Sequence, residues 1–146
     1  MLLYKLVRCK LYKLILKKDI QIPEVTDVEM AIVYEYNDIY KTDDWNVYII
    51  NKKNVDIEMV MIVSQGFSKT KTTSLLRKKL EKLPANSFAK VELIQPELFS
   101  LSNRFQVTFF EGNTLYDKTF TFEANTIKEG ALRMIPELNK RGVLAK

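Results

Sequence analysis

The sequence predicts an all-β fold built as an antiparallel sandwich. Apolar and polar residues alternate with a two-residue period in several segments, which is typical of strands with one wetter face. Polar turn residues separate these segments about every 8 to 12 residues, and no segment has the length and period of a long helix. The chain has 146 residues, 47% of them apolar. A chain of this size buries roughly 68–70% of its unfolded surface, enough for an independent core.

The first predicted strand covers residues 28–35, where Val28, Met30, Ile32 and Tyr34 alternate with Glu29, Ala31, Val33 and Glu35. A polar connection follows at 37–44. Residues 45–50 and 55–64 are apolar on both faces, as expected of central strands. Because a polar turn at 51–54 separates them, we predict that these two strands form a hairpin.

Residues 72–83 allow two interpretations. Leu76, Leu80 and Leu83 have helical spacing, Thr73 or Ser74 can serve as an N-cap, and Pro84 would end a helix. The segment lies between predicted strands, however, and the following turn at 83–87 is typical of a chain that crosses from one sheet to the other. We favour a loose strand, with a short helix or turn as the alternative.

The clearest predicted hairpin joins residues 104–110 to 115–123 through a turn at 111–114. One face of each strand is aromatic or aliphatic: Phe105, Val107 and Phe109 on the first, Phe120 and Phe122 on the second. Six to eight short strands therefore predict an antiparallel immunoglobulin-like β-sandwich, with at most one short helix around 72–83. We expect one such domain over residues 19–146.

Residues 1–18 form a basic, apolar N-terminal extension that we expect to lie outside the sandwich. They contain six of the 23 Lys and Arg residues and no acid. The rest of the chain therefore has 17 Lys and Arg residues and all 18 Asp and Glu residues. The net charge of +5 thus becomes −1 for the rest of the chain. A cation every two to four residues fits neither a signal peptide nor a spanning helix.

The composition restricts the chemistry that the chain can perform. The sequence has no histidine, the usual general base of nucleophilic triads and a common metal ligand. Cys9 is the single cysteine, so no internal disulfide and no cysteine metal site can form, which favours a reducing, cytoplasmic location. We expect no catalytic residue, no cofactor and no metal, and therefore not an enzyme.

Three partial motifs do not change this expectation. Residues 65–70 contain a Gly and a Lys-Thr pair but lack the first glycine and the spacing of a phosphate-binding loop. Asp43 and Asp44 favour a turn role over cation binding, because adjacent acids in an extended chain point apart. A glycosidase pair would need Glu29 or Glu35 beside Glu92 or Glu123, a placement that the sequence alone does not fix.

One segment of the body, residues 69–82, has a local excess of positive charge and is a candidate basic patch for phosphates. A solvated face is favoured, because no RNA-binding aromatic motif accompanies it and the body carries no overall positive charge. The patch consists of Lys69, Lys71, Arg77, Lys78, Lys79 and Lys82.

Several stretches resemble a group of short bacterial proteins, many of which carry the name phenylalanyl-tRNA synthetase alpha subunit. These stretches are KKDIQIP at 17–23, DWNVYIIN at 44–51, IEMV at 57–60, VSQGF at 63–67, SFAKVE at 87–92 and RGVLA at 141–145. The resemblance covers residues 17–146 and implies a usual start near Leu16. It brings no catalytic motif, and the arginine-bearing segments of a synthetase are absent from the sequence.

We therefore expect a non-enzymatic binding or interaction module that presents strand edges or loops to a protein partner. One alternative is a nucleic-acid-associated protein that uses residues 69–82. The other, which follows from the resemblance, is an accessory protein linked to tRNA aminoacylation.

Overall fold

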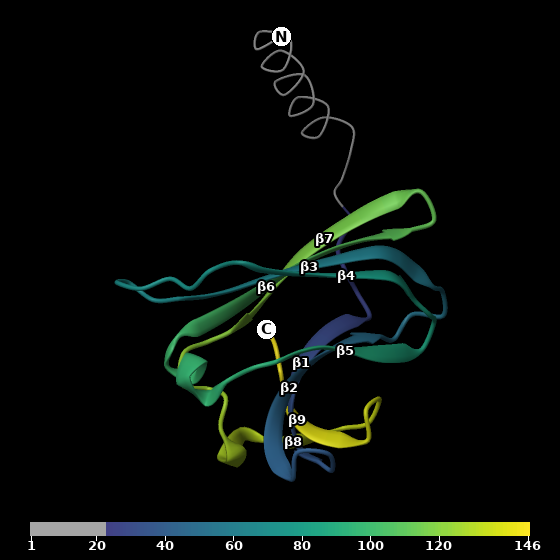
Figure 1. Ribbon diagram of the computed structural model, residues 1–146. Coiled ribbons are helices and arrows are strands. Elements are labelled where there is room, and N and C mark those ends of the chain that lie inside the picture. Colours follow the sequence, from purple (N-terminus) through teal and green to yellow (C-terminus); the bar gives the residue numbers. More distant parts are fainter. Residues whose placement is uncertain (1–22) are drawn as a thin grey trace, which may run out of the picture.

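The structure, a computed structural model, describes residues 23–146 and contains nine strands in two antiparallel sheets (Figure 1). The predicted extension at 1–18 lies outside the described residues. The strands are β1 (Val28–Asn37), β2 (Thr42–Asn51), β3 (Ile57–Phe67), β4 (Leu76–Leu83), β5 (Ser87–Leu93), β6 (Ser102–Glu111), β7 (Thr114–Phe122), β8 (Arg133–Ile135) and β9 (Lys140–Leu144). Two short 3-10 turns, η1 (Pro96–Ser100) and η2 (Glu129–Ala131), are the only helical turns of this part of the chain.

The two sheets form separate layers (Figure 1). One has five strands in the order β5-β2-β1-β9-β8, and the other has four in the order β4-β3-β6-β7. Side chains from both sheets fill the space between them, among them Ile32 and Ile49 from the first and Ile62, Phe105 and Phe109 from the second. The all-β, two-layered prediction is therefore confirmed.

The predicted pairing of residues 45–50 with 55–64 is wrong. Both segments are strands, but β2 pairs with β1 and β5, whereas β3 pairs with β4 and β6 in the other sheet. A strand that is apolar on both faces fits the centre of either sheet, so its composition does not select its neighbour. The polar connection at 37–44 is also shorter than expected, because β1 and β2 remain paired as far as Asn37 and Thr42.

Residues 76–83 form strand β4, as the favoured interpretation predicts, and the helical alternative is wrong. The leucine spacing also suits a strand, since Leu76 and Leu80 differ by an even number and lie on one face. The turn after Leu83 carries the chain from the four-stranded sheet to β5 in the other sheet. The hairpin of β6 and β7 is confirmed, with Glu111 paired to Thr114 across the turn.

Strands β8 and β9 were not predicted, and they give the five-stranded sheet a second, smaller apolar cluster. Ile135 and the nearby Leu138 pack on the outer side of the sheet against Val33, Tyr48 and Ile50, all of them buried. This short hairpin explains why the outward residues of β1 and β2 are as apolar as the inward ones.

Gly142 sets how closely β9 approaches β1. A Cβ atom at this position would lie 2.7 Å from the Ile32 carbonyl oxygen and 2.9 Å from Ile135 Cδ1. The carbonyl belongs to the backbone of a central strand, so β9 would have to move. We expect Gly142→Ala to lower the free energy of unfolding by about 1–3 kcal/mol in urea titrations. Gly130→Ala is the matched control, because no atom lies within 4 Å of its Cβ position; equal losses at both sites would contradict this account.

Candidate functional site

The candidate site lies on the outer face of the five-stranded sheet, where β1 and β2 meet in a hairpin. Residues 35, 46 and 48 share this face, because the outward side of β1 includes Val33 and its cross-strand partner is Asn46. The apolar cluster under β8 and β9 occupies one part of the face. Toward the hairpin, polar side chains replace it.

Glu35 is the centre of this polar group. Its Oε1 accepts hydrogen bonds from Asn46 Nδ2 at 3.0 Å and from the Tyr48 hydroxyl at 2.7 Å. Lys140 reaches across from β9, and its Nζ lies 3.0 Å from Glu35 Oε2. This contact is an ion pair, but its geometry is not that of a hydrogen bond. The carboxylate thus ties β1, β2 and β9 together on the outer face.

These contacts set the protonation of the group. Burial acts to raise the pKa of Glu35, but the hydrogen bonds from Tyr48 and Asn46 and the Lys140 ammonium outweigh it, so the pKa lies below its ordinary value. The pKa of Tyr48 is raised by burial and by the adjacent carboxylate. At neutral pH, Glu35 is therefore charged and Tyr48 is a hydrogen-bond donor.

Asn46 is the unusual member of the group, since it is buried, 2% exposed, in an otherwise apolar run of β2. Its Nδ2 must face Glu35, because a carboxylate accepts and does not donate, and this fixes Oδ1 on the opposite side. No donor from residues 23–146 reaches Oδ1. A buried acceptor without a partner costs about 1–3 kcal/mol. Oδ1 is shielded from solvent by the fold.

Asn46 and Glu35 line a cavity of about 330 Å³ beside the hairpin turn. Tyr36 and Ile39 form its apolar side and Lys90 of β5 its far side. The cavity therefore combines polar side chains with an apolar wall, the composition expected of a site that orients a bound group.

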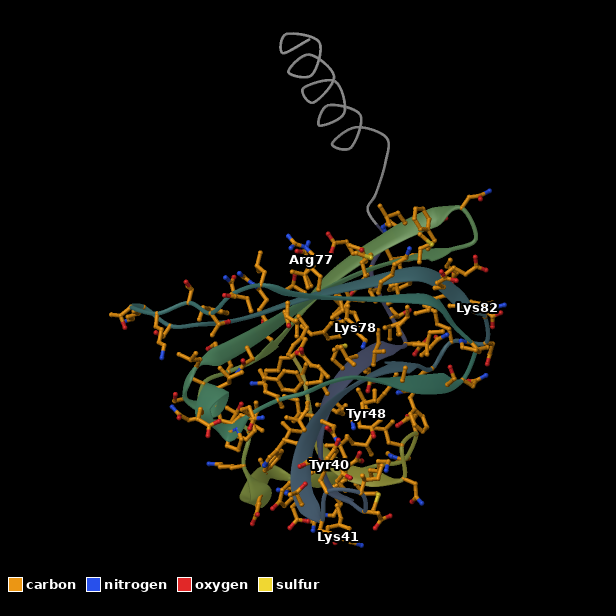
Figure 2. All side chains as sticks on the ribbon, viewed as in Figure 1. Tyr40, Lys41, Tyr48, Arg77, Lys78 and Lys82 are labelled. Carbon is orange, nitrogen blue, oxygen red and sulfur yellow. The ribbon has the colours of Figure 1, made fainter. Side chains whose placement is uncertain are left out.

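The turn between β1 and β2 carries exposed apolar side chains next to this cavity. Ile39 is 83% exposed and Tyr40 is 75% exposed, and Figure 2 shows Tyr40 at the end of the molecule formed by this turn. The backbone that carries them is held, because Asn37 Oδ1 accepts from the Ile39 and Tyr40 N–H groups at 2.9 and 3.2 Å. We call the surface formed by Tyr36, Ile39, Tyr40 and the adjoining cavity the hairpin face.

Asp44 has the turn role that its position predicts. Its two carboxylate oxygens accept from Asn37 Nδ2 at 3.1 Å and from the Thr42 hydroxyl at 2.9 Å. Asp43 lies opposite Tyr36 in the ladder. Within residues 23–146, no group of three or more acidic or cysteine side chains could hold a metal ion.

The six cations of the predicted basic patch are all exposed, but they lie in four places. Lys69 and Lys71 occupy the loop between β3 and β4. Arg77 and Lys79 lie on the outer side of β4, whereas Lys78 pairs with the buried Ile62 and lies on the core side. Figure 2 shows Arg77 outside the layer and Lys78 between the two layers.

Lys82, the sixth cation of the patch, forms an ion pair with Asp56 at 3.1 Å, at the far end of β4 (Figure 2). Its charge is therefore partly compensated. The described residues do not bring the six cations together on one surface. Strand alternation separates residues that are adjacent in the sequence.

Comparison of the chain with protein-family models, curated proteins and solved structures gives no match. Among residues 23–146, no helix has the length and apolar character that a membrane-spanning segment needs.

Proposed function

We propose that the protein is a non-enzymatic interaction module that binds a protein partner through the hairpin face. One observation carries the proposal: Ile39 and Tyr40 are the two most exposed large apolar side chains of the described residues, and Ile39 lines a cavity together with the exposed Tyr36. Contiguous exposed apolar groups beside polar ones are typical of protein-binding surfaces. The absence of histidine from the whole sequence favours binding over acid–base catalysis.

The chemistry of the face defines the partner that would fit it. An apolar segment of the partner would cover Ile39 and Tyr40. The hydrogen bonds to the Asn37 side chain already fix the conformation of the turn. Association therefore costs little conformational entropy at the turn. The single cysteine, Cys9, favours a cytoplasmic setting for this interaction.

The strand order supports the finer part of the fold prediction, an immunoglobulin-like domain. In such domains the first, second and fifth strands share one sheet, and the sixth strand lies between the third and the seventh in the other. Here β1, β2 and β5 are neighbours in one sheet, and β3, β6 and β7 are neighbours in the other. The fourth strand departs from the constant-type order, because β4 pairs with β3 and does not join the sheet of β1, β2 and β5. On this proposal, β8 and β9 are additions to the edge formed by β1.

Site-specific photo-crosslinking in cells of the source organism tests the proposed function. A photoreactive phenylalanine analogue at Ile39 or Tyr40 should yield the same crosslinked protein. The analogue at Leu115, which is exposed on the opposite sheet, is the matched control and should not. Crosslinking confined to Leu115, or no protein adduct from the hairpin face, would contradict the proposal. An adduct with nucleic acid, lost when Lys78 and Lys79 are both replaced by glutamate, would favour the nucleic-acid alternative.

A further inference from the structure

A second cavity, of about 350 Å³, opens between the two sheets and is separate from the hairpin face. It lies on the side where the edge strands β4 and β5 face each other. Apolar atoms from both sheets form most of its wall, and polar side chains, among them Ser64 and Glu92, complete the lining. The residues that matter here are Ser64, Leu76, Glu92, Leu98 and Phe105.

A β-bulge directs Glu92 into this cavity. The ladder between β2 and β5 shifts register after Val47, so that Glu92 is opposite Val47 while Lys90 is opposite Tyr48. Val91 is the extra residue, and it is buried on the core side. Without the shift, the alternation after Val91 would turn Glu92 outward. Bulges that redirect a side chain are common next to functional sites.

Glu92 has little compensation for its burial. The pKa of its carboxyl group is raised by burial, and this effect exceeds the opposing effects of a hydrogen bond from Ser64 and of the Lys78 charge. Within residues 23–146, no Lys or Arg nitrogen lies within 4.0 Å of the Glu92 carboxylate. Lys78, the cation on the facing edge strand, is itself exposed. A cation that entered the cavity would stabilise the carboxylate.

We propose that the cavity between β4 and β5 binds a small amphiphilic cation, with its ammonium group on Glu92 and its apolar part against Leu76, Leu98 and Phe105. The ammonium donates to a carboxylate oxygen and to the Ser64 hydroxyl oxygen, while Lys78 turns toward solvent. The volume lies at the lower end of the usual range for ligand sites, which favours a small molecule over a long chain. This ligand site is independent of the proposed protein interaction.

Titration of the full chain with n-hexylammonium, followed by NMR, tests the proposal, with hexanoate and n-hexanol as matched probes. We expect saturable binding of hexylammonium with shifts at Ser64, Leu76 and Glu92, and at least tenfold weaker binding of the other two probes. Equal or tighter binding of hexanoate or hexanol would overturn the proposal.

Two variants on facing strands make the test specific. Glu92→Gln should weaken hexylammonium binding at least tenfold. Because the raised pKa means that the charged form is the less favourable one in the fold, this variant should keep or raise the thermal midpoint at neutral pH. Lys78→Gln should tighten binding, since it removes a competing cation. Lys79→Gln lies on the opposite face of β4 and is the control. Unchanged affinity in Glu92→Gln, or weaker binding in Lys78→Gln, would overturn the proposal.

Discussion

Replacement of Asn51 by aspartate should destabilise the protein by about 3–5 kcal/mol at neutral pH. Asn51 is 1% exposed at the end of β2. Its Nδ2 donates to the carbonyl oxygens of Val55, Leu83 and Pro84 at 3.0, 3.2 and 3.0 Å. Aspartate would place a carboxylate oxygen against these three acceptors in a buried site, where neither hydration nor a cation offsets the charge.

The stability lost in Asn51→Asp should depend on pH. One oxygen of the new carboxyl group would face the three carbonyl acceptors, and the other would keep only the Lys53 N–H, which donates to Asn51 Oδ1 at 3.0 Å. The protonated form is therefore favoured, and the folded-state pKa lies above the unfolded value. The variant should therefore recover part of its stability as pH falls from neutral to mildly acidic. Urea unfolding at both pH values measures this. Asn113→Asp, the same change in the exposed β6–β7 turn, should cost no more than about 0.5 kcal/mol. Similar losses for both variants would show that the three carbonyl contacts do not matter.

Asn51 also explains why the placement of β2 and β3 in different sheets could not be predicted from the sequence. The side chain joins the connection from β2 to β3 with the connection from β4 to β5, which are the two places where the chain changes sheet at this end. A polar turn at 51–54 is compatible both with a hairpin and with a crossover to the other sheet. The contacts that distinguish them join residues 32 and 33 positions apart.

The sequence predicts the strands well where one face is buried. Phe105, Val107 and Phe109 alternate with polar residues, and the structure buries all three. The short strands β8 and β9 escape prediction because they have three and five residues and contain charged side chains. Their position depends on Gly142, whose close approach to β1 has no signal in the period of the sequence.

The candidate sites depend on features that a two-residue period does not contain. Glu92 enters the inter-sheet cavity through a register shift that no local pattern indicates. Asn46 can be recognised in the sequence, because it is the single polar residue in the apolar run at 45–50. For the basic segment, the sequence supplies the charges, but only the β4 register separates Lys78 from Arg77 and Lys79.

Replacement of Phe109 by alanine should also cost about 3–5 kcal/mol, because it removes a buried aromatic side chain and leaves a cavity between the sheets. Phe109 is 0% exposed, and its ring stacks on Tyr116 with a centroid distance of 5.2 Å. Its neighbour Phe110 faces outward on the same strand and is 38% exposed. Phe110→Ala removes the same atoms one position along the chain, so it is a matched control, with an expected loss of about 1 kcal/mol or less.

Guanidinium unfolding distinguishes these outcomes for the Phe109 and Phe110 variants. We expect the midpoint to fall strongly for Phe109→Ala and weakly for Phe110→Ala, with the slope unchanged in both, since neither variant alters the area exposed on unfolding by much. Equal losses would mean that both faces of β6 are buried, for example by a partner on the outer side of the four-stranded sheet. A larger loss at Phe110 would place the core on the wrong side of β6 and would contradict the register with β7, in which Phe109 lies opposite Tyr116.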